Sequence, residues 1–417
     1  MVNIENHPCY NQSAAHHTGR VHLPVARKCN VQCNFCNRKY DCANENRPGV
    51  STAVLSPVQA GSYLDRILAI EPNISVVGIA GPGDPFANPE ETLETLSLVH
   101  ASHPDKLLCL SSNGLYLPDY VDRIAQLGVS HVTITVNAVD ASIGAHIYEW
   151  FYYEGNLHQG EEGASFLLQR QTEALKQLKR HGIIVKINTV VIPRINMQHV
   201  PQIAEYVAAL GADVQNCIPL IPVAGTPFET LYEPSADDMR KVRAQASVYI
   251  NQMAHCARCR ADAVGLLGKD NSDDVNMALR NAQRKPIFEQ KPYIAVASSD
   301  AVSVDLHLGE AEQLLVFEWA DGKVRLKEKR SLKRITGDRW ADLASEIADC
   351  AALLTNGLGM APFNYLSEHG FFVEAVSGRI DVAATALFQG QPIPSELLRL
   401  AGACDDACPA SAHRQCN

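Results

Sequence analysis

Three cysteines near the start of the chain, Cys29, Cys33 and Cys36, have the spacing of a metal-binding loop. Thiolates at this spacing in a tight loop can bind three irons of a four-iron, four-sulfide cube. The fourth iron then has no protein ligand, and an open coordination position is typical of catalytic rather than structural metal sites. A zinc knot and a chance grouping of cysteines are the alternative interpretations.

This C-x3-C-x2-C motif resembles the signature of the radical S-adenosylmethionine (SAM) superfamily. The resemblance implies a [4Fe-4S] cluster whose open iron binds SAM through its amino and carboxylate groups. It also implies that an electron from the cluster cleaves SAM to a 5′-deoxyadenosyl radical. Cys29, Cys33 and Cys36 would then hold the catalytic centre.

A glycine-rich turn, residues 81–85, follows an apolar stretch that predicts a strand. Glycine lets the backbone approach a ligand closely. The turn resembles the radical SAM loop that contacts the SAM amino group, so Gly81, Gly83 and Asp84 are candidate SAM-binding residues. An ordinary strand-to-helix turn explains the pattern equally well. Weaker candidates for the SAM carboxylate and ribose, each also explained as an ordinary polar residue of a turn or strand, are Asn113, Asn137 and Asn188.

The chain contains 13 cysteines, far more than one cube requires. Two further [4Fe-4S] clusters could be bound by three ligands each. One ligand set would be Cys9, Cys42 and Cys109, and the other Cys256, Cys259 and a histidine. Zinc binding by Cys256 and Cys259 is an alternative, and so is burial of Cys109 as a small apolar side chain.

Several longer stretches resemble the NifB family of nitrogenase-cofactor maturases. They are residues 7–10, 20–26, 29–42, 44–50, 80–85 and 256–265. The resemblance covers roughly residues 5–280, and residues 293–390 look like the NifX-type domain that many bacterial members carry. Two departures, Asn46 in place of a serine and Arg27-Lys28 before the first motif cysteine, remove no ligand.

The resemblance to this family implies a reaction. Two [4Fe-4S] substrate clusters are fused, with insertion of a SAM-derived carbide, into an [8Fe-9S-C] precursor of the nitrogenase iron-molybdenum cofactor. The family motif makes His22, seven residues before Cys29, the preferred histidine ligand, and His16 or His17 is the second choice. Glu45 could bind an exchangeable iron or relay a proton, and a plain surface carboxylate is the alternative.

Strand-like and helix-like stretches alternate through the first two thirds of the chain, after an irregular segment over residues 1–50. The pattern predicts an α/β fold with a parallel sheet, here a partial or complete TIM-type barrel over residues 1–282. Such barrels carry their chemistry after the strands. The expected strands are 74–80, 107–110, 132–136, 183–192 and 213–218, and the last helix is expected over 236–253.

A polar, proline-containing segment over residues 283–292 predicts a linker. Residues 293–390 predict a small α/β domain with a helix over 339–353, and the NifX resemblance implies a ribonuclease H-like architecture. Residues 391–417 form a tail. We assign no role to its cysteines, Cys404, Cys408 and Cys416.

Composition limits the partners. The 417 residues include 36 Lys and Arg against 46 Asp and Glu, a net charge of −10, which argues against nucleic acid and anionic membranes. No signal peptide or membrane span is visible, so we expect a cytoplasmic protein. The family implies three kinds of partner: cofactor carriers or scaffolds of nitrogenase assembly, iron–sulfur donors, and a reducing ferredoxin or flavodoxin. Another radical SAM maturase with auxiliary clusters, or a non-enzymatic iron–sulfur carrier, remains open.

Overall fold

The structure is a computed structural model that describes residues 6–268, 272–332 and 339–399. It divides into two compact units. The first comprises Met1–Leu64 and Asn73–Asp270, and the second comprises Asp65–Pro72 and Asn271–Asn417. The tail cysteines lie outside the described residues.

The first unit is built on a seven-stranded sheet of order β10-β1-β3-β4-β5-β8-β9. All neighbours from β1 to β9 are parallel, and β10 is antiparallel to β1. The sheet is open, with β10 and β9 as its edges, so the α/β prediction is confirmed and the barrel is partial. The strands are β1 (Gly19–His22), β3 (Ile74–Ile79), β4 (Leu107–Ser112), β5 (Val129–Thr135), β8 (Ile184–Val191), β9 (Val214–Pro219) and β10 (Val264–Gly265).

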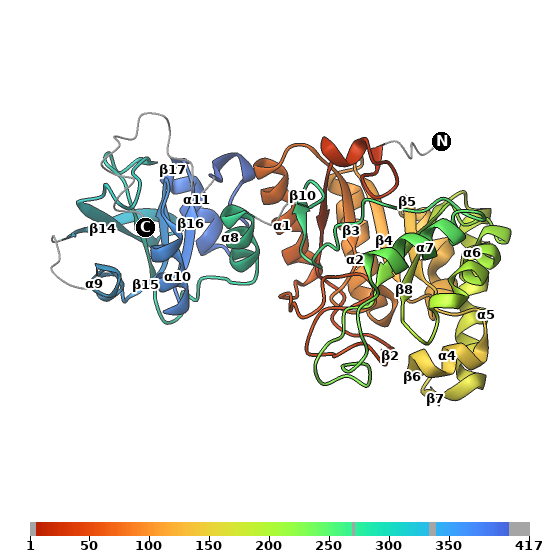
Figure 1. The fold of residues 1–417 in the computed structure, drawn as a ribbon. Coiled ribbons are helices and arrows are strands. Elements are labelled where there is room, and N and C mark those ends of the chain that lie inside the picture. Colours follow the sequence, from red (N-terminus) through yellow and green to blue (C-terminus); the bar gives the residue numbers. More distant parts are fainter. Residues whose placement is uncertain (1–5, 269–271, 333–338, 400–417) are drawn as a thin grey trace. The chain divides into compact units, whose positions relative to one another are not determined.

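Helices connect these strands and pack along the sheet (Figure 1). The longest of them, α5, has Glu161 and Glu162 in its first turn and Lys179 and Arg180 in its last. This arrangement stabilises the helix, because each pair of charges is opposite in sign to the helix dipole at its end. None of the described helices is both long and apolar enough to cross a membrane. The helices of this part of the chain are α1 (Pro57–Ile70), α2 (Pro89–Ser102), α3 (Val121–Gln126), α4 (Ala141–Ile147), α5 (Gly160–Arg180), α6 (Val200–Ala209) and α7 (Ala236–Ala246).

Residues 1–50, expected to be irregular, contain two short strands. One is β1, and the other is β2 (Val31–Cys33), which pairs with β6 (Tyr148–Tyr153). Strand β6 pairs in turn with β7 (Asn156–His158), so these three strands form a small sheet beside the cysteine motif. Strands of three or four residues are too short to show an alternating pattern, which is why the prediction missed them. The helix expected over 236–253 ends at Ala246.

The second unit contains a five-stranded sheet of order β14-β13-β11-β15-β16, with an antiparallel half and a parallel half. Apolar clusters cover both faces, one including Met277 and Phe363 and the other Ile380 and Leu387. The strands are β11 (Tyr293–Val296), β13 (Gln313–Ala320), β14 (Lys323–Ser331), β15 (Cys350–Thr355) and β16 (Phe372–Ala375), and a separate pair is β12 (Ser303–Val304) with β17 (Gly378–Arg379). The helices are α8 (Asp273–Ala282), α9 (Arg339–Glu346), α10 (Met360–Glu368) and α11 (Ile380–Phe388).

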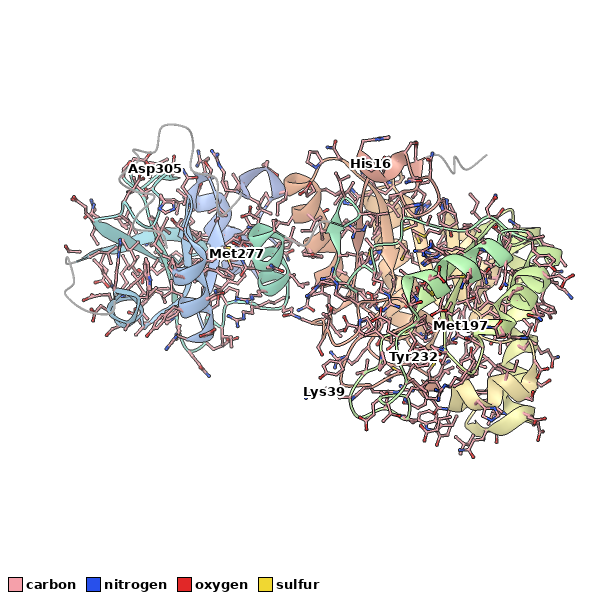
Figure 2. The ribbon with its side chains drawn as sticks, viewed as in Figure 1. His16, Lys39, Met197, Tyr232, Met277 and Asp305 are labelled. Carbon is pink, nitrogen blue, oxygen red and sulfur yellow. The ribbon has the colours of Figure 1, made fainter. Side chains whose placement is uncertain are left out.

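Two boundaries differ from expectation in this unit. Helix α8 supplies Met277 to the core of the second unit (labelled in Figure 2), so contacts divide the chain near residue 270, before the predicted linker at 283–292. The helix expected over 339–353 ends at Glu346, and Cys350–Thr355 is a fully buried strand. An unbroken apolar run fits a buried strand and a buried helix equally well, so the sequence pattern could not separate them.

Candidate active site

A cavity of about 420 Å³ lies at the carboxyl ends of β3, β4 and β5, where an α/β barrel is expected to carry its chemistry. Lys39 lies at its wall and is labelled in Figure 2, at the opposite end of the first unit from His16. The residues of the predicted site that line the cavity are Cys29, Cys33, Cys36, Cys42, Glu45, Gly83, Asp84 and Asn113.

The loop that carries the three motif cysteines is held by Arg38. Its guanidinium donates hydrogen bonds to the carbonyl oxygens of Cys29 and Val31, both at 2.7 Å. It also lies over the ring of Trp150 on β6, 5.2 Å from the ring centre. Arg38 therefore ties the loop to the small sheet of β2, β6 and β7.

Amide groups approach the sulfurs of this loop. Asn44 Nδ2 lies 3.9 Å from Cys33 Sγ and 3.6 Å from Cys42 Sγ, and Asn113 Nδ2 lies 3.8 Å from Cys29 Sγ. Burial raises the pKa of the Cys29 thiol to about 11, so iron must displace a proton from it on binding. Hydrogen bonds to sulfur are the usual surroundings of an iron–sulfur cluster. The donor set therefore fits a [4Fe-4S] cluster.

A single-ion site is a poorer fit. Among the described residues, no three His, Cys, Asp or Glu side chains converge on one metal ion. A four-iron cube places a different iron at each thiolate, so its ligands need not converge on a point. The arrangement thus favours a cluster over the zinc alternative.

The glycine-rich turn after β3 approaches the cysteine loop through its backbone. A β-carbon on Gly83 would lie 2.1 Å from the Lys28 carbonyl oxygen, and on Gly81, with φ +140°, 2.8 Å from Asn46 Nδ2. Asn46 is buried and donates to the Ala80 carbonyl oxygen at 3.0 Å, so asparagine suits this position. Only glycine permits these approaches, which gives Gly81 and Gly83 a structural reason beside any contact with SAM.

Asp84 joins the ends of two strands. Its carboxylate accepts hydrogen bonds from the backbone N–H of Phe86 (2.9 Å) and of Asn113 (2.6 Å), and from Ser112 Oγ (3.0 Å). Burial raises its pKa, against the lowering effect of these bonds. Asp84 thus holds Asn113 in the cavity wall.

Two of the predicted SAM-binding asparagines do not line the cavity. Asn137 Nδ2 donates to Asn44 Oδ1 at 3.3 Å, and Asn188 Nδ2 donates to Glu45 Oε2 at 2.9 Å. Both side chains therefore orient residues that do line it.

Glu45 lies at the cavity wall with partners on both oxygens. Thr135 Oγ1 donates to Oε1 at 2.8 Å, and Asn188 donates to Oε2. Burial raises the pKa of Glu45, and the positive charge of Lys186 opposes this effect. A carboxyl group with a raised pKa is suited to holding or moving a proton.

A second group of candidate ligands is centred on the strands of the seven-stranded sheet. His22, Gly78, Cys109 and His131 occupy one row across β1, β3, β4 and β5. His22 Nδ1 lies 3.0 Å from the carbonyl oxygen of Arg260. Because a carbonyl can only accept, Nδ1 carries the proton and Nε2 keeps a lone pair, the arrangement typical of a histidine metal ligand. Burial lowers the pKa of His22 to about 4.

Cys9, Cys109, Cys256 and Cys259 belong to this second group. Burial, with smaller contributions from the Cys259 and Cys256 thiols, raises the pKa of Cys9 to about 11. Cys109 interacts electrostatically with Cys9, and Arg20 Nη2 lies 3.1 Å from Cys259 Sγ.

Cys42 is grouped differently. Burial raises the pKa of the Cys42 thiol most, and the next largest contributions come from Cys36 and Cys29. Cys42 lines the cavity with these two residues. The structure thus brings Cys9 and Cys109 together with the Cys256–Cys259 pair, and places Cys42 beside the motif. His16 and His17 are exposed.

Sequence reasoning missed Lys186, which is buried on β8. Burial lowers its pKa, but Cys9, Glu45, Cys256 and Cys109 together raise it. The signal was a single charged residue within a strand that is otherwise uncharged. The remaining described cysteines, Cys217 and Cys350, are fully buried and belong to neither group.

Comparison with known proteins agrees with this geometry. Residues 23–207 match the radical SAM superfamily, and residues 290–390 match the dinitrogenase iron-molybdenum cofactor family. The chain is 48% identical over 396 residues to the FeMo cofactor biosynthesis protein NifB of Chlorobaculum tepidum, covering 94% of this chain and 93% of that protein. The chain belongs to the NifB family.

A second member of the family, the NifB of Klebsiella pneumoniae, is 38% identical over 400 residues, with 87% of this chain and 86% of that protein covered. Among solved structures, the FeFe-hydrogenase maturase HydG from Carboxydothermus hydrogenoformans is similar with 14% identity and a TM-score of 0.41. That match covers 56% of this chain and 52% of the other.

Proposed function

We propose that the chain is a radical SAM enzyme of iron-molybdenum cofactor biosynthesis that fuses two [4Fe-4S] clusters into an [8Fe-9S-C] product. The carbide comes from a SAM methyl group. The observation that supports this most is the presence of two separate ligand groups within one unit: the motif cysteines at the cavity, and the second group around Cys9 and Cys109. A radical SAM enzyme acting on an organic substrate requires only the first.

Cys29, Cys33 and Cys36 would hold the catalytic [4Fe-4S] cluster. When bound, that cluster supplies one electron for the reductive cleavage of SAM. Asn113 and residues 82–84 form the wall on which SAM would lie, and Asp84 fixes this wall through its three hydrogen bonds. The chain's own part is to orient SAM and to exclude water.

The two substrate clusters would be held by Cys9, Cys42, Cys109, Cys256, Cys259 and His22. Six ligands for two clusters leave irons without protein ligands, and incomplete ligation suits substrates that must react and leave. A neutral imidazole adds no negative charge, and the lone pair on His22 Nε2 is available to iron. Glu45, held between Thr135 and Asn188, would accept or relay a proton as hydrogen leaves the methyl carbon.

Charge at the cavity suggests the electron donor. Four exposed cations, Arg27, Lys28, Arg38 and Lys39, line the cavity of a chain whose net charge is −10. Complementary charge speeds association, so an acidic ferredoxin or flavodoxin is the donor we propose.

We assign exchange with iron–sulfur donors and with carriers or scaffolds of nitrogenase assembly to the NifX-like domain over residues 293–390, and place the protein in the cytoplasm.

Anaerobic reconstitution with iron and sulfide tests this proposal. We expect about twelve irons per chain, as three four-iron clusters, and formation of both S-adenosylhomocysteine and 5′-deoxyadenosine with dithionite and SAM. Replacement of a cysteine outside both ligand groups serves as the control. The Cys350→Ala chain should bind as much iron as the unaltered chain, because this thiol is buried in the second unit. Iron without SAM cleavage would favour a cluster carrier. SAM cleavage without an eight-iron product would favour a different radical SAM maturase.

A further inference from the structure

His7 is buried in the interior of the first unit, two residues before Cys9. Only 2% of its surface is exposed. Its ring lies 4.4 Å from the ring of His131, centre to centre, and 4.8 Å from that of Tyr10. His131 is fully buried and stands opposite Cys109 in the β4–β5 register. His7 therefore lies against the row of strand residues that carries the second ligand group.

The proton of the His7 ring can be assigned from its contacts. The backbone N–H of Cys9 donates to His7 Nδ1 at 3.1 Å. A backbone N–H cannot accept a hydrogen bond, so Nδ1 presents its lone pair, and the ring proton is on Nε2. His7 Nε2 is thus a hydrogen-bond donor.

This donor has no acceptor. Within the part of the chain that the structure describes, His7 Nε2 is buried without a hydrogen-bond partner. A buried donor left without a partner costs free energy and is rare in native proteins. Its surroundings include the cation of Lys186 and the imidazoles of His22 and His131, which favours an anionic acceptor.

We propose that His7 is a positioning residue whose Nε2–H donates a hydrogen bond to a sulfide of a substrate cluster bound by the second ligand group. This inference rests on the proposed function, because it requires a cluster at these ligands. Cluster sulfides are anionic acceptors, and hydrogen bonds to them raise the reduction potential and fix the orientation of a cluster. The Cys9 N–H to Nδ1 bond would link the ligand loop and the donor in one rigid unit.

Two other roles for the ring are less compatible with its contacts. As an iron ligand, Nε2 would need a lone pair, and the proton would have to move to Nδ1, where it would oppose the Cys9 N–H. A bond from Nε2 to His131 Nε2 is the remaining alternative. It is not formed, because both atoms are buried without partners.

The test uses the full chain with Cys29, Cys33 and Cys36 changed to alanine, so that only substrate clusters contribute to the spectra. His7→Phe removes the donor, and His7→Gln keeps an N–H. His181→Phe is the matched control, since this histidine lies on the surface at the end of α5. The reduced proteins are compared in H2O and D2O by pulsed electron–nuclear double resonance, with the iron content and the midpoint potential of each cluster.

We expect His7→Phe to lose one exchangeable proton coupling and to lower the potential of one cluster, with the iron content unchanged. His7→Gln and His181→Phe should retain both properties. Unchanged coupling and potential in His7→Phe would overturn the proposal, as would loss of the cluster in both His7 variants or loss of a directly bound nitrogen coupling. A parent chain that binds no iron after reconstitution would instead refute the proposed function, and this inference with it.

Discussion

Replacement of Asp84 by alanine tests how the cavity wall is held. The change leaves three buried donors without their acceptor: the N–H groups of Phe86 and Asn113, and the hydroxyl of Ser112. The hydroxyl can rotate toward another acceptor, but the two backbone N–H groups cannot. At roughly 1–3 kcal/mol for each unsatisfied group, we expect the free energy of unfolding to fall by about 4 kcal/mol.

Urea unfolding of the cluster-free chain, followed by circular dichroism, measures this loss. Asp84→Asn keeps one acceptor oxygen and should lose about half as much free energy. Asp140→Ala is the matched control, because Asp140 accepts from the Ser142 N–H and hydroxyl in the same way but at an exposed helix start. Since Asp84 also holds Asn113, Asp84→Ala should weaken SAM binding and Asp140→Ala should not. Equal losses of stability for Asp84→Ala and Asp140→Ala would refute the reasoning.

Three further predictions concern the ligands. The Cys29, Cys33, Cys36→Ala chain should lose about a third of its iron and all 5′-deoxyadenosine formation; residual cleavage would contradict the catalytic assignment. If His22 binds a cluster, pulsed electron paramagnetic resonance should detect a coupling between its ring nitrogen and the cluster, and His22→Ala should abolish this coupling. Gly78→Ala should alter the coupling, because the new β-carbon would lie 3.1 Å from His22 Cδ2. Gly61→Ala, whose β-carbon would have no atom within 4 Å, should leave it unchanged. In the cluster-free chain at pH 8, iodoacetamide should modify the exposed Cys256 and spare the buried Cys217. Burial raises the pKa of Cys217 to about 12, so little of this thiol is present as the reactive thiolate. Equal rates of modification at the two cysteines would contradict this prediction.

The parallel sheet could be predicted from the sequence because its strands are apolar and separated by clear helices. The cysteine motif could be predicted because its three ligands are close in sequence. Strands β2 and β7 were missed because three residues are too short to show a pattern, although β2 carries Cys33 itself. Strand β6 was missed because its buried positions fall on every third residue and do not alternate.

The second ligand group was harder to predict, because its members come from distant segments. Nothing in the spacing of Cys9, Cys42 and Cys109 indicates that Cys42 lies at the cavity while Cys9 lies near Cys256 and Cys259. The alignment of His22 with Cys109 depends on the strand register, which only the fold defines. The same holds for Asn137 and Asn188, whose contacts with Asn44 and Glu45 no sequence pattern indicates.

The origin of the central carbon is the most direct test of the proposed reaction. The reconstituted full chain is given SAM labelled with carbon-13 in its methyl group, together with dithionite, and the cluster product is extracted. Pulsed electron–nuclear double resonance of that product should show a carbon-13 coupling, which unlabelled SAM does not produce. Formation of 5′-deoxyadenosine with all of the label left outside the cluster would contradict the account.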